Sequence, residues 1–146
     1  MTAFKEFSAR FAQTVCLLTH DILGAQRSCT ISSYSSVSTS TDVDVFSFSL
    51  AQDIFMAGMM QESSKVQITL LGRHQSNVAK YYARNRFDSD RFEINRVVAE
   101  SIGVVKGSIT KSIPVGSSVL YLAEVENIEL FSLDSRPLVY LLRNYE

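Results

Sequence analysis

The sequence has few of the residues that would point to a disulfide-stabilised, metal-binding or acid/base site. Its 146 residues include two cysteines and two histidines. Cys16 and Cys29 form no C-x-x-C pair and lie in apolar, strand-like surroundings, so we expect two buried thiols rather than a disulfide or a metal site. His20 and His74 lie far apart in the sequence, and we assign neither to catalysis. We expect no metal.

Charge excess and long apolar runs are also lacking. The formal net charge is −1. Proteins that bind nucleic acids or acidic membranes usually carry a clustered excess of positive charge. We therefore expect no nucleic-acid or membrane partner. No apolar run is long enough to span a bilayer. The opening residues M-T-A-F-K-E-F are too charged for a signal peptide, so we expect a cytoplasmic protein.

What is present is the composition of an ordinary globular protein. Hydrophobic residues make up 46% of the chain and charged residues 20%. No internal repeat or low-complexity linker divides the sequence. At this length a fold can bury a real core without a covalent staple, so we expect a single domain over residues 1–146.

A hydroxyl-rich tract is the most informative segment. Twelve of the twenty-two residues from Ser28 to Ser49 are serine or threonine. They are interleaved with branched aliphatic and aromatic residues, which disordered hydroxyl-rich tracts lack. The tract therefore predicts two strands whose polar face holds water, a neighbouring strand or a bound molecule. The apolar residues change from odd to even positions between Val45 and Phe46, and this break in the alternation predicts a bulge there.

Short helices and strands are expected along the rest of the chain. Phe4, Phe7 and Phe11 fall at helical spacing, which places them on one face of an opening helix that Thr2 could cap. The mixed charges of residues 84–101 favour an irregular excursion or a partner surface. The remaining patterns predict helices at 52–62 and 75–84 and strands at 14–20, 65–71, 104–110, 119–130 and 137–143. This is a mainly β (α+β) chain, best fitted by an antiparallel barrel with short flanking helices.

The order of these segments resembles the short-chain flavin reductase family, the flavin reductase-like proteins with an FMN-binding split barrel. The similarity begins with F-K-E-F-S-A-R-F-A-Q-T-V-C-L-L-T. It continues through T-I-S-S-Y-S-S-V-S, which is similar to the flavin loop T-x-x-S-x-x-S-V-S of the family, and through F-S-F-S-L. It ends with L-Y-L-A-E-V-E-N-I-E and P-L-V-Y-L-L-R-N-Y. The resemblance implies an antiparallel split β-barrel over nearly the whole chain.

The resemblance also implies cofactors, partners and site residues. FMN or FAD would be the cofactor, NADH or NADPH the co-substrate, and a flavin-dependent monooxygenase the partner of a homodimer. No catalytic side chain is assigned, because the flavin carries the redox chemistry and the protein positions it. Residues near the flavin ring, ribityl chain or phosphate would be Thr30, Ile31, Ser32, Ser33, Ser36, Ser38, Ser47 and Ser49. Second-tier candidates are Ser118, Arg143 and Tyr145.

Two departures from the family pattern fall at functional positions. Asp53, in D-I-F-M, stands where the family has hydroxyl donors to the flavin phosphate, and a carboxylate repels a phosphate. Ser118 stands where the family has a histidine associated with the nicotinamide site, and serine cannot carry its charge. An arginine fork could compensate at the phosphate. Arg73 is the best placed candidate by family topology, with Arg27 and Arg84 as the others.

Two functions remain open. The first is an NAD(P)H-dependent flavin reductase that supplies reduced flavin to a partner monooxygenase. The second is a non-catalytic split-barrel protein that binds flavin or another ligand, having lost the phosphate and nicotinamide determinants. Asp53 and Ser118 are the sequence features that separate the two.

Overall fold

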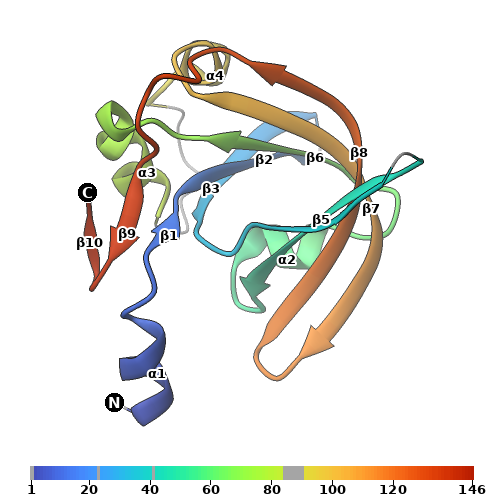
Figure 1. The fold of residues 1–146 in the computed structure, drawn as a ribbon. Helices are drawn as coiled ribbons and strands as arrows, with labels where there is room; N and C mark the ends of the chain where they lie inside the picture. The colour runs from blue at the N-terminus through green and yellow to red at the C-terminus, as the bar shows by residue number, and fades with distance from the viewer. Residues whose placement is uncertain (1, 23, 41, 84–90) are drawn as a thin grey trace.

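The computed structural model describes residues 2–22, 24–40, 42–83 and 91–146. Within them, one antiparallel sheet has seven strands in the order β3-β2-β6-β7-β8-β5-β4, and a smaller sheet has three in the order β1-β9-β10. Figure 1 shows the large sheet curving over α2, with α3 and α4 on one side and α1 standing away from the barrel. The strands are β1 (Gln13–Thr14), β2 (Cys16–Ile22), β3 (Ala25–Ile31), β4 (Ser35–Thr39), β5 (Asp44–Ala51), β6 (Lys65–Leu70), β7 (Gly103–Val115), β8 (Ser118–Leu130), β9 (Val139–Leu141) and β10 (Asn144–Tyr145).

Five helical segments of the described chain connect or flank these strands. They are α1 (Ala3–Ser8), α2 (Phe55–Met59), the 3-10 turn η1 (Arg73–Gln75), α3 (Ser76–Tyr82) and α4 (Ile94–Ala99). None of the helices in these parts of the chain is long and apolar enough to cross a membrane. The antiparallel, mainly β architecture with short helices confirms the fold class predicted from the sequence.

The barrel core is built by alternation along β5. Phe46, Phe48 and Leu50 are buried, while the residues between them are half-buried on the other face. The ring of Phe48 stacks on Phe46 at 6.3 Å and on Tyr121 of β8 at 5.0 Å between centroids. Aromatic pairs at these separations add to the free energy of burial, so this stack fixes how β5 and β8 face each other.

The predicted bulge lies in the strand next to β5. Pairing between β5 and β8 is continuous from Val45 to Ala51. The register shifts instead in β4, between Ser36 and Ser38, opposite Phe46 and Val45. The prediction of a bulge inside β5 was therefore wrong. The pattern of apolar residues changes parity because Val45 and Phe46, which lie on opposite faces of a regular strand, are both apolar. The extra residue is Val37 of β4.

A second apolar cluster lies between the sheet and the helices α3 and α4. Leu17 of β2 and Leu71 are fully buried against Val78 of α3 and Val97 of α4. The helix α4 corrects the expectation of an irregular excursion over residues 84–101, of which 84–90 lie outside the described residues. Ile94 and Val97 are both buried, and their spacing of three places them on one helical face despite the charges around them.

The opening helix is shorter than its aromatic spacing suggested. The side chain of Thr2 caps α1 by accepting a hydrogen bond from the Lys5 N–H at 3.2 Å. The helix ends at Ser8, so Phe11 lies beyond it, although the rings of Phe7 and Phe11 still meet edge to face at 5.2 Å. Phe4 is 76% exposed and Phe7 61%. This aromatic face makes no contribution to the barrel core.

Candidate functional site

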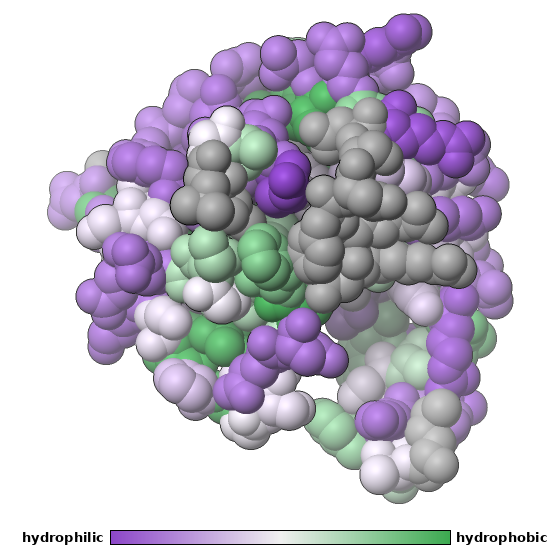
Figure 2. Space-filling view, turned by 180° about the vertical axis from the view of Figure 1, so that it is seen from behind, coloured by the Kyte–Doolittle hydropathy of each residue, from purple (hydrophilic) through white to green (hydrophobic). Residues whose placement is uncertain are grey.

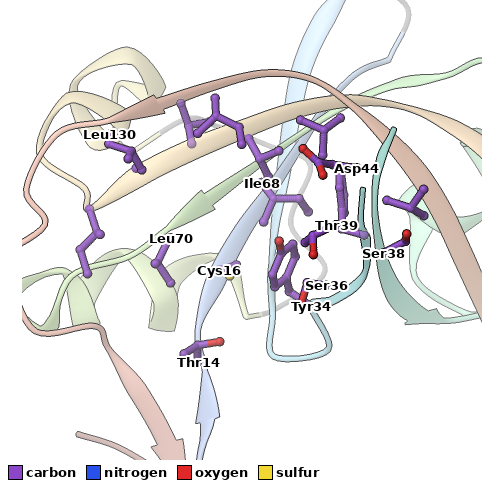
Figure 3. A pocket seen from close by; sticks show the side chains of 18 residues that line it. Thr14, Cys16, Tyr34, Ser36, Ser38, Thr39, Asp44, Ile68, Leu70 and Leu130 are labelled. Atoms are coloured by element: carbon purple, nitrogen blue, oxygen red, sulfur yellow. The ribbon is translucent and has the colours of Figure 1, made fainter. Parts of the chain in front are cut away.

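The segment S-S-Y-S-S, residues 32–36, runs from the end of β3 into the first two residues of β4 and borders two cavities. We call it the S-S-Y-S-S loop. We call the first the barrel cavity, with a volume of about 420 Å³. Figure 3 shows Ser36, Ser38, Thr39 and Asp44 on one side of it, with Cys16, Ile68, Leu70 and Leu130 on the other. Its remaining lining residues are Thr14, Tyr34, Val45, Phe46, Ile102, Gly103, Val104, Val105, Val125 and Ile128.

The barrel cavity has one hydroxyl-bearing side and one apolar side. Ser36, Ser38 and Thr39 come from the exposed strand β4. The ring of Tyr34 packs against Phe46 at 5.7 Å. Desolvation raises the pKa of the Tyr34 hydroxyl, which therefore stays protonated at neutral pH. Among the described residues that line it, Asp44 is the sole charged side chain, so these residues offer hydroxyls and apolar surface but no cation.

We call the second cavity the basic cleft, with a volume of about 470 Å³. It lies where α1, β1, β9 and the turn to β10 meet the loop after β3. Of the residues that the structure describes, the cations that line it are Lys5 and Arg143. The other lining residues are Ser8, Ala9, Phe11, Gln13, Ser32, Tyr140 and Leu142.

Two hydroxyls of the tract hold the fold together. The Thr30 hydroxyl donates to the backbone carbonyl of Ala79 in α3 at 2.7 Å. The Ser33 hydroxyl donates to the Ser49 carbonyl at 2.9 Å and accepts from the Ser49 N–H at 3.0 Å. These two hydrogen bonds, which we call the Ser33 clip, attach the loop to β5. Flavin contacts by Thr30 and Ser33 stay predictions, and both hydroxyls have intramolecular partners.

The other predicted residues of the tract lie in three places. Ile31 is 5% exposed and belongs to the barrel core. Ser47 and Ser49 are half-buried on the face of β5 opposite to its phenylalanines, and neither lines the two cavities. Ser32 lines the basic cleft, whereas Ser36 and Ser38 line the barrel cavity. The loop therefore presents its hydroxyls to both cavities.

The candidate phosphate-binding arginines are not gathered at these cavities. Arg73 is exposed at the start of η1, where its backbone N–H donates to the Arg136 carbonyl at 2.8 Å. Arg27, on β3, donates from its guanidinium to the Gln26 carbonyl at 3.3 Å. Neither lines the barrel cavity or the basic cleft. Arg84 lies outside the described residues.

The two departures from the family pattern meet at one corner. Ala51, two residues before Asp53, pairs with Ser118 at the start of β8. The backbone N–H of Gln52 donates to the Ser117 carbonyl at 2.9 Å, which fastens this turn to the tip of the β7–β8 hairpin. Asp53 itself is exposed. The change at the expected phosphate position and the change at the expected nicotinamide position are therefore close neighbours in space.

Sequence reasoning named Arg143 and Tyr145 as second-tier candidates but missed Lys5 and Gln13, which also line the basic cleft. Arg143 lines the basic cleft, and Tyr145 lies beside it with its ring 5.0 Å from that of Tyr140. Lys5 and Gln13 join them from the opposite end of the sequence. An exposed lysine on a short helix carries no distinguishing signal, so only the fold could identify it.

The cysteines are inert in this structure. Cys16 and Cys29 are free and buried, and burial raises the pKa of both thiols to about 12. They are therefore protonated and poor nucleophiles at neutral pH. Within the described ranges, no three His, Cys, Asp or Glu residues are grouped so as to hold a metal ion.

Comparison with solved structures finds flavin reductases of the same fold. The styrene monooxygenase flavin reductase from Pseudomonas putida S12 is 19% identical, with a TM-score of 0.84, over 99% of this chain and 96% of that one. A flavin reductase domain protein from Arthrobacter sp. FB24 is 22% identical, with a TM-score of 0.84, over 98% and 92%. The NADH:FAD oxidoreductase from Streptomyces globisporus C-1027, solved with NAD and FAD fragments, is 15% identical, with a TM-score of 0.82, over 98% and 89%.

The sequence comparisons agree with the fold. No curated protein matches the sequence. The model of one protein family does match it, the "Flavin reductase like domain", over residues 8–146. That match takes in the hydroxyl-rich tract, both sheets and the C-terminal turn. The chain therefore belongs to the flavin reductase like domain family.

Proposed function

We propose that the protein is an NAD(P)H-dependent flavin reductase that binds FMN or FAD and supplies reduced flavin to a partner monooxygenase. The observation that carries this proposal is the S-S-Y-S-S loop, whose serines face both an apolar cavity and a basic cleft. Family membership supports it. The styrene monooxygenase reductase and the oxidoreductase solved with NAD and FAD fragments are relatives in fold that point the same way.

The residues around the loop fit the ring and ribityl chain of a flavin. A ring system needs apolar surface, and a ribityl chain needs hydroxyl partners. The barrel cavity offers both, with Ile68 and Leu70 on one side and Ser36 and Ser38 on the other. The flavin would lie against the loop, with Ser36 and Ser38 nearest to the chain or phosphate and the backbone of Thr30 to Ser33 along the ring.

The phosphate corner fits a flavin less well. Asp44 adds a carboxylate to the barrel cavity, and Asp53 adds another to the exposed turn after β5. A carboxylate next to a phosphate raises the free energy of the bound state, because both carry negative charge. We therefore propose weakened binding of FMN. Arg73 could offset part of this repulsion only if the phosphate reached the start of η1.

The protein would act mainly by positioning. The chemistry supplied by a bound flavin is two-electron reduction by hydride from a reduced nicotinamide. The chain contributes an apolar wall that excludes water, hydroxyls that fix the flavin, and a loop held rigid by the Ser33 clip. Such preorganisation lowers the barrier by removing the entropy of alignment. Ser118 could donate a hydrogen bond to the nicotinamide, but it supplies no charge there.

We further propose a homodimer with the flavin pockets at the subunit interface. On the face seen in Figure 2, some hydrophobic residues are exposed near the middle, among hydrophilic ones. Ile128 and Leu130 line the barrel cavity and are 51% and 62% exposed. Exposed apolar surface next to a cavity is typical of an association site. The two free thiols also agree with a cytoplasmic location, where cysteines stay reduced.

The decisive experiment measures oxidation of NADH and NADPH by the purified protein, with no flavin, with FMN and with FAD. We expect oxidation that requires added flavin. Absence of flavin-dependent oxidation with either nucleotide would remove the reductase proposal. It would favour the second candidate, a split-barrel protein that binds flavin or another ligand without turnover. That candidate is supported by the adjacency of Asp53 and Ser118 through the Ala51–Ser118 pair.

Replacing the carboxylate at the phosphate corner should strengthen flavin binding. Asp53→Ser removes a negative charge and restores a hydroxyl donor, so we expect FMN to bind about tenfold more tightly, the change that roughly 1.4 kcal/mol produces. Quenching of FMN fluorescence during titration measures the affinity. Glu62→Ser, an exposed carboxylate beyond α2, is the control. Equal or weaker binding by Asp53→Ser would contradict the assignment of this corner.

A further inference from the structure

Four aromatic rings form a column that runs from the barrel cavity to α2. Tyr34 packs on Phe46 at 5.7 Å between ring centroids. Phe46 packs in turn on Phe48 at 6.3 Å, and Phe48 packs on Tyr121 at 5.0 Å. Phe46, Phe48 and Tyr121 are fully buried. Because each ring is held by the next, the column fixes the position of the Tyr34 ring at its open end.

The column has a tyrosine at each end, and the two hydroxyls differ in their partners. The Tyr121 hydroxyl donates to the Ala57 carbonyl in α2 at 3.1 Å. Within the parts of the chain that the structure describes, the Tyr34 hydroxyl has no hydrogen-bond partner. Desolvation raises the pKa of this hydroxyl, and the nearby Cys16 thiol raises it further. The Tyr34 hydroxyl is thus a protonated group that is partly shielded from water and unpaired.

This hydroxyl is directed into the barrel cavity. Figure 3 shows the Tyr34 side chain between Cys16 on one side and Ser36 and Thr39 on the other, with its oxygen pointing into the cavity. Ile68, on the wall that it faces, offers only apolar surface. A phenol donates one hydrogen bond and also accepts. The partner of this hydroxyl is therefore a molecule inside the cavity.

The hydroxyl of Tyr34 adds nothing to the packing of the column. A phenylalanine ring would contact Phe46 in the same way and would not place a polar group in a desolvated site. The hydroxyl of Tyr121, by contrast, is repaid by its bond to α2. Polar groups that raise the free energy of the folded state without a partner are typical of binding sites.

We propose that the Tyr34 hydroxyl binds the polar edge of a planar ring in the barrel cavity, and that it orients the isoalloxazine ring of the flavin there. The inference rests on the proposed function for the identity of the ring, and on the cavity and the hydroxyl alone for ring binding. An isoalloxazine has carbonyl oxygens and nitrogens at its edge and apolar faces, which match a phenol donor among apolar walls. Tyr34 occupies an unspecified position of the pattern T-x-x-S-x-x-S-V-S.

The test uses lumiflavin, the flavin ring without ribityl chain or phosphate, as a probe on the flavin-free, full-length protein. Quenching of lumiflavin fluorescence measures its Kd. Tyr34→Phe keeps the ring that packs on Phe46 and removes only the hydroxyl. We expect lumiflavin to bind about tenfold more weakly, because its edge loses a partner in a desolvated site. The visible absorption of bound lumiflavin should shift toward that of the ring in an apolar solvent, which a merely structural role would not cause.

Tyr121→Phe, at the other end of the column, is the matched control. It removes a hydroxyl that has a backbone partner, so the midpoint of urea denaturation should fall while the Kd of lumiflavin stays unchanged. Tyr34→Phe should show the opposite pair of effects, with weaker binding and a urea midpoint equal to or above that of the wild type. A lower midpoint for Tyr34→Phe would show that its hydroxyl stabilises the fold, and would contradict the proposal.

A series of ligands separates the ring from the chain. Ser38→Ala removes a hydroxyl that we place near the ribityl chain or phosphate, so it should weaken riboflavin and FMN and leave lumiflavin unchanged. Tyr34→Phe should weaken lumiflavin, riboflavin and FMN by the same factor, because all three carry the same ring. Loss of affinity for riboflavin and FMN alone would place Tyr34 at the chain and overturn its assignment to the ring.

Failure of this proposal can be distinguished from failure of the reductase function. No lumiflavin binding by the wild type, or an equal Kd in Tyr34→Phe, would overturn the role of Tyr34, and flavin-dependent oxidation of NADH or NADPH would still support the reductase. Lumiflavin binding that depends on Tyr34, in a protein without such oxidation, would support the ring site and remove the reductase.

Discussion

At the residue scale, serine and threonine have different roles according to where the side-chain hydroxyl finds a partner. Thr30 and Ser33 are bonded to backbone groups of Ala79 and Ser49. Ser36 and Ser38 face the barrel cavity from an exposed strand. Hydroxyls of the first kind stabilise the fold, because a buried backbone group left unpaired raises the free energy of the folded state. Those of the second kind are available to a ligand.

Removing the Ser33 clip should destabilise the protein. Ser33→Ala leaves both the N–H and the carbonyl of Ser49 without their partner. We expect the free energy of unfolding to fall by about 1–2 kcal/mol, measured by urea denaturation. Ser35→Ala is the matched control, because that exposed hydroxyl makes only a 3.4 Å contact with the next carbonyl. Equal losses in the two variants would show that the clip does not hold the loop.

These roles could be predicted only in part from the sequence. Alternation along residues 35–39 indicates that Ser36 and Ser38 share a face, apart from the bulge at Val37. The partners of Thr30 and Ser33 lie 49 and 16 residues away, so no local pattern identifies them. Lys5 and Arg143 reach one cleft from opposite ends of the chain. Their convergence depends on the fold and leaves no trace in spacing.

At the scale of elements, the bend of the long β7–β8 hairpin depends on a glycine. Gly107 lies beside a register shift in β7. A Cβ atom at this position would collide with the Glu124 carbonyl oxygen and lie 3.0 Å from the Phe46 ring. Close approach of two strands therefore requires glycine here.

Alanine at this glycine and at a helical one should act in opposite directions. Gly107→Ala is expected to lower the free energy of unfolding by about 1–3 kcal/mol through overpacking. Gly58→Ala, in α2, adds a Cβ atom with nothing within 4 Å, and should raise it by about 0.5–1 kcal/mol. Chemical denaturation of both variants measures the difference. A tolerated alanine at 107 would contradict the close packing of β7 on β8.

The strained C-terminal turn offers a second test at this scale. Leu142 and Arg143 form the two-residue turn between β9 and β10, with φ angles of +48° and +66°. Leu142→Asn with Arg143→Gly supplies the residues that positive φ favours, so we expect the free energy of unfolding to rise by about 1–2 kcal/mol. Leu142→Asn alone should give a smaller gain, and urea denaturation of both variants measures the difference. Lower stability of the double variant would argue against strain in the turn.

For the whole molecule, association should depend on the apolar rim of the barrel cavity. Leu130→Asp places a charge on a cavity-lining residue that is 62% exposed. The dissociation constant of the dimer should therefore rise about tenfold or more. Analytical ultracentrifugation measures this. Leu133→Asp, at a residue 71% exposed outside the cavity lining, is the control. A wild-type monomer, or equal effects of the two variants, would contradict the proposed interface.

The fold class could be predicted from the sequence, but the positions of one helix and of the bulge could not. Strand alternation and turn residues are local signals, so the mainly antiparallel class followed from them. Helix α4 was missed because Ile94 and Val97 are its only buried residues among charged neighbours. The bulge was misplaced because the apolar phase of one strand does not say which of two paired strands holds the extra residue.

The order of strands in the large sheet also sets a constraint on synthesis. Strand β5, with Phe46 and Phe48, pairs on one side with β8, which is completed only at Leu130. At about 5–20 residues per second, the nascent chain carries an unpaired apolar strand edge for several seconds before its partner is made. The β4–β5 hairpin forms early because it is local, and it protects the other edge. Efficient production in the cell therefore depends on keeping the β8 edge of β5 from pairing with other chains until β8 has been synthesised.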